Sequence, residues 1–134
     1  MKLEAYIDGG SRGNPGEAGS GVYIAGQLRL AEYLGVQTNN YAEYSALISA
    51  VRAAVVLRCD ELAVYADSEL VVKQIKGEYE VRSEGIRPLY ESAKRWIRLI
   101  PQFSIHHIRR EMNKDADKLA NLAMDRRANF AERL

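Results

Sequence analysis

The chain has 134 residues, of which 47% are hydrophobic, and it carries 19 basic and 18 acidic side chains for a formal net charge of +1. This length predicts one globular domain spanning residues 1–134. The near-neutral charge excludes an acidic tail and strong non-specific attraction to nucleic acid, so any contacts with nucleic acid must be local.

Cysteine usage and hydropathy narrow the setting further. Cys59 is the only cysteine, which excludes an intramolecular disulfide and a Cys-x-x-Cys metal site. The sequence has no basic leader followed by an apolar core, and no apolar run of about 18 residues. We therefore expect a monomer in a reducing, cytoplasmic compartment, with no membrane segment.

The first predicted elements are strands. Apolar and polar residues alternate over 3–7, which predicts a strand with Asp8 at its carboxyl end. The glycine-rich stretch 8–21 predicts a long loop, which leads into a hairpin formed by residues 19–25 and 27–34. This part of the chain is therefore expected to form three antiparallel strands.

The middle of the chain alternates between helix and strand. Apolar residues recur with a period near 3.6 over 40–57, which predicts a long buried helix that opens with a capping box of Asn40 and Glu43. A short strand over 62–66 ends at Asp67, and either Asp67 or Ser68 suits the cap of the next helix.

The last third of the chain repeats this alternation. We expect a helix over 86–100, a strand over 103–109 and a final helix capped by Asn113. The charged residues 125–134 are expected to form the end of that helix and a frayed terminus. The order of elements predicts an α/β fold with a mixed five-stranded sheet, in which three antiparallel strands are followed by parallel ones.

Four acids lie at the ends of predicted elements. Asp8 and Asp67 follow strands, at the edge where α/β sheets bind ligands, while Glu43 and Asp117 lie near the starts of helices. If these carboxylates converge they require cations, and Mg²⁺ prefers such oxygen ligands. Each acid alone also suits an ordinary role in a turn, a cap or the first turn of a helix, so spacing leaves both interpretations open.

The segments that carry these acids resemble type 1 ribonuclease H in the order of that family's motifs, and the similarity runs from Lys2 to about Ala123. The four matching segments are residues 8–16 (DGGSRGNPG), 38–43 (TNNYAE), 66–69 (ADSE) and 113–120 (NKDADKLA). The resemblance implies a ribonuclease H-like fold and an endoribonuclease that hydrolyses the RNA strand of RNA/DNA hybrids, in the removal of RNA primers and R-loops.

The same resemblance implies the roles of individual residues. Asp8, Glu43, Asp67 and Asp117 would be catalytic and would ligate two Mg²⁺ ions, for which Mn²⁺ could substitute, in a reaction that leaves 5′-phosphate and 3′-hydroxyl ends. Amide and hydroxyl groups can recognise the 2′-hydroxyl that distinguishes RNA from DNA. The positions expected to bind substrate are Gly9, Asn14, Asn39, Asn40, Ser68 and Asn113.

Two features common in the family are missing. The basic protrusion near the middle helices is absent, and the loop before the last helix carries residues 109–112 (RREM) where many members have a histidine. His106 and His107 are adjacent in a predicted strand, so they point to opposite faces and cannot share a metal. This pattern resembles a short form of the family. The alternatives are a related-fold nuclease acting on double-stranded RNA or DNA, and a catalytically silent hybrid-binding module.

Overall fold

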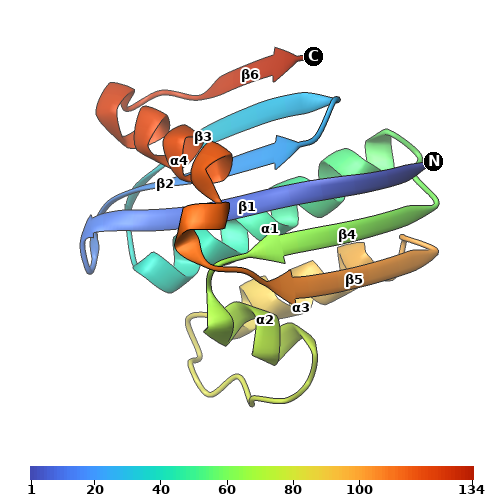
Figure 1. Cartoon of the computed structure of the whole chain (residues 1–134). Coiled ribbons are helices and arrows are strands. Elements are labelled where there is room, and N and C mark those ends of the chain that lie inside the picture. Colours follow the sequence, from blue (N-terminus) through green and yellow to red (C-terminus); the bar gives the residue numbers. More distant parts are fainter.

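The computed structural model describes residues 1–134 as a six-stranded mixed sheet with helices on both faces (Figure 1). The elements are β1 (Lys2–Gly13), β2 (Gly16–Ile24), β3 (Leu28–Gln37), α1 (Asn39–Val56), β4 (Glu61–Ala66), α2 (Glu69–Ile75), α3 (Arg87–Ile97), β5 (Gln102–His107), a 3₁₀ turn η1 (Arg110–Met112), α4 (Lys114–Arg126) and β6 (Phe130–Arg133). The strand order across the sheet is β5-β4-β1-β2-β3-β6.

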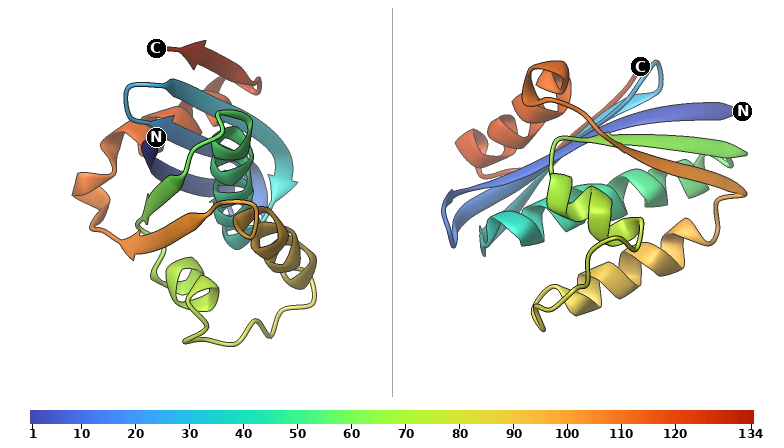
Figure 2. Two further views of the ribbon diagram at one scale, coloured as in Figure 1. Left: turned by 90° about the vertical axis from the view of Figure 1, so that its right-hand side faces the viewer. Right: turned by 60° about the horizontal axis from the view of Figure 1, so that its bottom comes forward.

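The sheet combines both kinds of strand pairing. β1, β2, β3 and β6 pair antiparallel, while β1, β4 and β5 run parallel, which confirms the predicted mixed α/β architecture. Helices α1 and α3 lie on one side of the sheet, and α4 lies on the opposite side over β2 and β3 (Figure 2). No helix is long and apolar enough to cross a membrane.

The main core lies between the sheet and α1. Leu3, Ala5 and Ile7 are buried on the α1 side of β1, as the predicted alternation requires. They pack in one cluster with Leu47 and Val51 of α1, which are also fully buried. Each such leucine or isoleucine contributes about 1.5–3 kcal/mol of hydrophobic stabilisation, so this layer fixes the strands that carry the site.

The predicted glycine-rich loop is wrong, because β1 continues to Gly13 and turns directly into β2. The glycines are needed where helices touch the strands. A Cβ atom on Gly9 would lie 2.2 Å from the carbonyl carbon of Ala42 in α1, and one on Gly21 would lie 2.3 Å from the carbonyl oxygen of Ala116 in α4. Glycine therefore lets two helices contact opposite faces of the central strands.

The predicted frayed terminus is also wrong, and it accounts for the sixth strand. Phe130–Arg133 pairs antiparallel with β3, where Phe130 is opposite Ala31. The side chain of Asn129 fixes the approach by accepting a hydrogen bond from the Tyr33 amide at 2.9 Å. A strand of four residues is too short for its alternation to stand out among charged side chains.

Two of the three predicted helix caps differ from expectation. Thr38, rather than Asn40, caps α1 by accepting from the Tyr41 amide at 3.1 Å. Ser68 caps α2 as predicted, by accepting from the Val71 amide at 3.3 Å. Asn113 precedes α4 but makes no capping hydrogen bond with its side chain. Glu43 and Asn113 are therefore free for the other contacts described below.

A row of side chains crosses all the strands on the side of the sheet that carries α4. The residues lie directly opposite one another in the strand register, in the order His106, Tyr65, Tyr6, Tyr23, Arg29, Glu132. The rings stack at centroid distances of 5.2, 5.0 and 6.1 Å, Arg29 lies over Tyr23, and it pairs with Glu132 at 2.5 Å. Cross-strand pairs of this kind stabilise a sheet, and here Tyr6 and Tyr65 lie two residues before Asp8 and Asp67.

Candidate active site

The pairing of β1 with β4 brings Asp8 and Asp67 together. Ile7 lies opposite Ala66 in the parallel register, so the next residue on each strand emerges at the same edge. β4 ends there while β1 continues, so Gly9 pairs with β2 but has no partner on the β4 side. The Gly9 amide donates to Glu43 Oε1 at 2.9 Å and to Asp8 Oδ1 at 3.0 Å.

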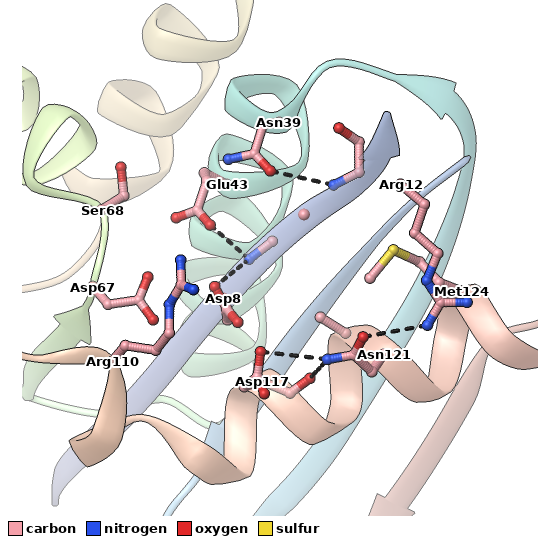
Figure 3. Close-up of a pocket in the computed structure, with 14 residues that line it drawn as sticks. Asp8, Arg12, Asn39, Glu43, Asp67, Ser68, Arg110, Asp117, Asn121 and Met124 are labelled. Carbon is pink, nitrogen blue, oxygen red and sulfur yellow. Dashed lines mark hydrogen bonds between the residues drawn. The ribbon is translucent and has the colours of Figure 1, made fainter. Parts of the chain in front are cut away.

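The result is a compact group of three carboxylates. One oxygen each of Asp8, Glu43 and Asp67 lies within 4.8 Å of the others. Glu43 is only 4% exposed, and its Oε2 atom is buried without a hydrogen-bond partner. Figure 3 shows the three side chains pointing toward one another at the end of a pocket of about 340 Å³.

Burial and neighbouring negative charge make Asp8 and Glu43 hard to ionise without a cation. Burial, followed by the charge of Asp67, raises the pKa of Asp8 to about 7. Burial and the charge of Asp8 raise the pKa of Glu43 well above its ordinary value, although the Gly9 amide opposes the shift. Acids perturbed in this way, inside a pocket, are typical of functional sites.

Asp117 approaches the same pocket from the first turn of α4. It is not part of the compact group of three, but its charge also raises the pKa of Asp8. Asn121, one turn later, donates from Nδ2 to the Asp117 carbonyl at 3.0 Å and to Asp117 Oδ1 at 3.4 Å. The four predicted acids therefore surround one pocket, and Asp117 is held by its own helix.

The structure places Asn113 beneath the site, where it is 1% exposed. Its Nδ2 donates to the Ile7 carbonyl at 2.7 Å and to Asp67 Oδ2 at 3.3 Å. The predicted contact between Asn113 and substrate is therefore wrong, because the side chain lies behind the carboxylates and supports Asp67.

The other predicted substrate-binding residues lie at the surface around the acids. Gly9, Asn39 and Ser68 line the carboxylate pocket. Asn14 and Asn40 line a neighbouring pocket of about 400 Å³, which Asn39 also borders. Asn39 connects β1 and α1, since its Oδ1 accepts from the Ser11 amide at 3.2 Å and its own amide donates to Asn14 Oδ1 at 3.1 Å.

Four polar residues that line the carboxylate pocket were not predicted as site residues, namely Ser11, Arg12, Arg110 and Asn121. Arg12 shares a strand face with Asp8 because the two are four residues apart, but this was hidden by the expectation of a loop. Arg110 belongs to the turn before α4, and its sequence carries no signal beyond the missing histidine. Asn121 follows Asp117 at the four-residue helical spacing, which was the one available signal.

The donor set fits divalent cations. The ligand atoms of the three-residue group are carboxylate oxygens, which suit hard ions such as Mg²⁺ and Mn²⁺. A cation would also satisfy the orphaned Glu43 Oε2 and relieve the repulsion that raises the pKa of Asp8. Asp8, Glu43 and Asp67 can therefore hold a divalent cation, and Asp117 borders the same pocket.

The chain matches the model of the reverse transcriptase-like family over residues 7–123. It is 38% identical over 129 residues to ribonuclease HI of Halobacterium salinarum, covering 92% of this chain and 65% of that protein. The crystal structure of the Halobacterium enzyme superposes with a TM-score of 0.88 at 36% identity, covering 94% of this chain and 99% of that one.

Two further structures give the same result. The N-terminal ribonuclease H domain of a Mycobacterium tuberculosis protein has a TM-score of 0.88 at 37% identity, covering 93% of this chain and all (100%) of that one. Ribonuclease H1 LC11, in complex with an RNA/DNA hybrid, has a TM-score of 0.86 at 36% identity, covering 93% and 98%.

Fold, site and sequence therefore agree: the chain belongs to the reverse transcriptase-like family and, within it, to type 1 ribonuclease H. This confirms the family expected from the motifs. The chain spans 65% of the length of the Halobacterium relative and 38% of the bifunctional Mycobacterium tuberculosis protein.

Proposed function

We propose that this chain is an endoribonuclease that hydrolyses the RNA strand of RNA/DNA hybrids. The observation that carries the proposal is the convergence of Asp8, Glu43 and Asp67, whose oxygens lie within 4.8 Å of one another in an open pocket. The solved relative in complex with an RNA/DNA hybrid supports the choice of substrate. Its cellular role would be removal of RNA primers and R-loops, as a cytoplasmic monomer.

Asp8, Glu43, Asp67 and Asp117 would hold two divalent ions, Mg²⁺ or Mn²⁺. Ions bound there would supply Lewis-acid chemistry, activating water for in-line attack on the scissile phosphate and neutralising charge on the leaving 3′ oxygen. The expected products carry 5′-phosphate and 3′-hydroxyl ends.

The protein itself keeps the carboxylates in place. The Gly9 amide fixes Glu43 and Asp8, and Asn113 fixes Asp67 from below. Such supporting hydrogen bonds set the direction of metal ligands before ions or substrate arrive. Arg110 lines the same pocket and brings a permanent positive charge to the place that a scissile phosphate would occupy.

Recognition of RNA would come from the amides beside the pocket. Asn39 and Asn14 use their Oδ1 atoms for hydrogen bonds within the protein, which leaves their NH₂ groups to donate outward. An NH₂ group held in this way can donate to a 2′-hydroxyl, which a deoxyribose lacks. We infer that Asn14, Asn39 and Asn40, with Gly9 and Ser68, contact the hybrid.

The decisive experiment compares end-labelled RNA/DNA hybrid, duplex RNA and duplex DNA, each incubated with the chain and Mg²⁺ or Mn²⁺. We expect cleavage of the RNA strand of the hybrid, no cleavage of duplex DNA, and no cleavage of the hybrid in EDTA. Cleavage by the Asp117→Asn variant should fall to the level seen without enzyme. The matched control is Asp115→Asn, an exposed acid in the same helical turn, which should retain activity.

Each failure has its own meaning. An inactive wild type that still binds the hybrid would identify a silent binding module. Efficient cleavage of duplex RNA or duplex DNA, with the hybrid left intact, would assign the site to another substrate. Equal activity in Asp117→Asn and Asp115→Asn would remove Asp117 from the site.

A further inference from the structure

A groove continues from the carboxylates between β1 and α4. Every second residue of β1 points to this groove, with steps of about 6.6 Å between successive residues. These residues are Asp8, Gly10 and Arg12. Opposite them, α4 presents residues spaced four apart, with steps of about 6 Å. These helix residues are Asp117, Asn121 and Asp125. Because the two spacings nearly match, the groove runs about 13 Å from Asp8 to Arg12, with Gly10 as its open floor.

Arg12 is only partly engaged by the protein. Its Nη2 donates to Asn121 Oδ1 at 3.3 Å and pairs with Asp125 Oδ1 at 2.5 Å. The Nε and Nη1 groups make no hydrogen bond to protein, and the side chain is 47% exposed. An ion pair this exposed contributes little to stability, so stability alone gives little reason for the arrangement.

The two basic residues of the pocket lie on different sides of its carboxylates (Figure 3). Four carboxylates line the pocket, and the only basic residues in its lining are Arg12 and Arg110. Figure 3 shows Arg110 on the side of Asp67 and Arg12 beyond Asn121, toward the far end of α4. A strand whose cleaved phosphate lies over the carboxylates would therefore have one arginine on each side of that phosphate.

We propose that Arg12 binds a phosphate of the RNA strand beyond the scissile one, and that Asn121 positions Arg12 relative to Asp117. The proposal rests on the proposed function. The guanidinium is permanently charged, and its free Nε and Nη1 groups can each donate a single hydrogen bond to a phosphate oxygen. Asn121 donates to Asp117 and accepts from Arg12, so one amide connects the phosphate contact to the fourth carboxylate.

The groove favours the RNA strand over the DNA strand. It continues from the carboxylates, so the strand that is cleaved is the one that enters it. Asn14, expected to sense the hybrid, borders the neighbouring pocket beside α1, and Asn39 borders both pockets. The Arg12 contact is therefore separate from the substrate-binding residues expected from the family motifs.

Binding is measured with the Asp8→Asn protein, so that the hybrid stays intact. Arg12→Ala in this background should weaken hybrid binding about 10-fold and reduce the slope of log Kd against log salt by about 1. Arg12→Lys keeps the positive charge and should therefore lose less hybrid-binding affinity than Arg12→Ala. The matched control is Arg127→Ala, an arginine 69% exposed outside the pocket and paired with Glu17, which should bind as its parent does.

A neutral phosphate identifies the contact. Single methylphosphonates, placed one at a time along each strand, remove the charge of one phosphate. At one RNA position the substitution should weaken binding by the parent but cause no further loss with Arg12→Ala, because the same contact is already gone. Additive losses at every position, or coupling to a DNA position, would overturn the proposal.

Asn121 is tested through the metal dependence of cleavage in otherwise wild-type protein. Asn121→Ala should raise the Mg²⁺ concentration for half-maximal rate about 10-fold, whereas Lys118→Ala, an exposed residue of the same helix, should not. An unchanged Mg²⁺ requirement would overturn the role of Asn121. If wild type neither binds nor cuts the hybrid, the proposed function fails; if it does both while Arg12→Ala matches Arg127→Ala, only this inference fails.

Discussion

Replacing Asp8 by asparagine should stabilise the metal-free protein while it abolishes activity. Burial and the charge of Asp67 raise the Asp8 pKa from 3.8 to about 7. At about 1.4 kcal/mol for each pKa unit, ionised Asp8 destabilises the folded state by up to about 4 kcal/mol. Partial contact with solvent screens part of this cost. We therefore expect Asp8→Asn to have a free energy of unfolding about 2–4 kcal/mol higher than that of wild type above pH 7.

The pH dependence of this gain follows from the direction of the shift. The folded protein holds the Asp8 proton more tightly than the unfolded chain, so the stabilisation from protonated Asp8 is complete below pH 3.8 and is lost as pH rises through about 7. The advantage of Asp8→Asn should therefore be largest at pH 8 and disappear near pH 4.

The assay is urea unfolding of both proteins in EDTA at several pH values, repeated with Mg²⁺. Bound metal should stabilise wild type by mass action. It should therefore reduce the difference in the free energy of unfolding between the two proteins at pH 8, because the variant has lost a ligand. An Asp8→Asn protein that is less stable than wild type at pH 8 without metal would refute the reasoning about repulsion in the site.

Three further predictions concern the fold. Gly9→Ala should destabilise the protein by at least about 3 kcal/mol in thermal unfolding, because the added Cβ would collide with α1. Gly10→Ala should leave the stability nearly unchanged, because the nearest atom to its Cβ would be 3.7 Å away. Tyr6→Ala removes two stacked pairs and should cost about 2–3 kcal/mol, compared with less than about 0.5 kcal/mol for Tyr79→Ala, whose residue is 45% exposed. Truncation before Phe130 should lower the midpoint of urea unfolding, since it removes β6; an unchanged midpoint would mean that this strand does not pair in solution.

The sequence predicts the elements whose signals are local. Alternation over 3–7 and the helical period after Asn40 correspond to β1 and α1 in the structure. The glycine-rich stretch was misinterpreted because its cause is tertiary: Gly9 and Gly21 are required by contact with α1 and α4, and a single sequence does not distinguish this need from a turn. The strand β6 was missed because only its partner β3 makes it a strand.

The candidate site shows the same division. Asp67 directly follows the end of β4, but Asp8 lies within β1 and not at its predicted end, and the identification of the full set of acids required the family motifs. Arg12 and Asn121 were out of reach because their relation depends on where α4 lies on the sheet. Asn113 was predicted to cap the last helix and to bind substrate, but its side chain is buried, where it donates to the Ile7 carbonyl and to Asp67.

The most direct test of the central claim is the chemistry of the cleaved ends. The account predicts that wild type cuts the RNA strand of a hybrid only with Mg²⁺ or Mn²⁺, and that mass spectrometry finds 5′-phosphate and 3′-hydroxyl termini. Glu43→Gln and Asp67→Asn should produce none. Cleavage that persists in EDTA, or ends that carry a 2′,3′-cyclic phosphate, would show that the RNA 2′-hydroxyl is the nucleophile and would contradict a metal-dependent carboxylate site.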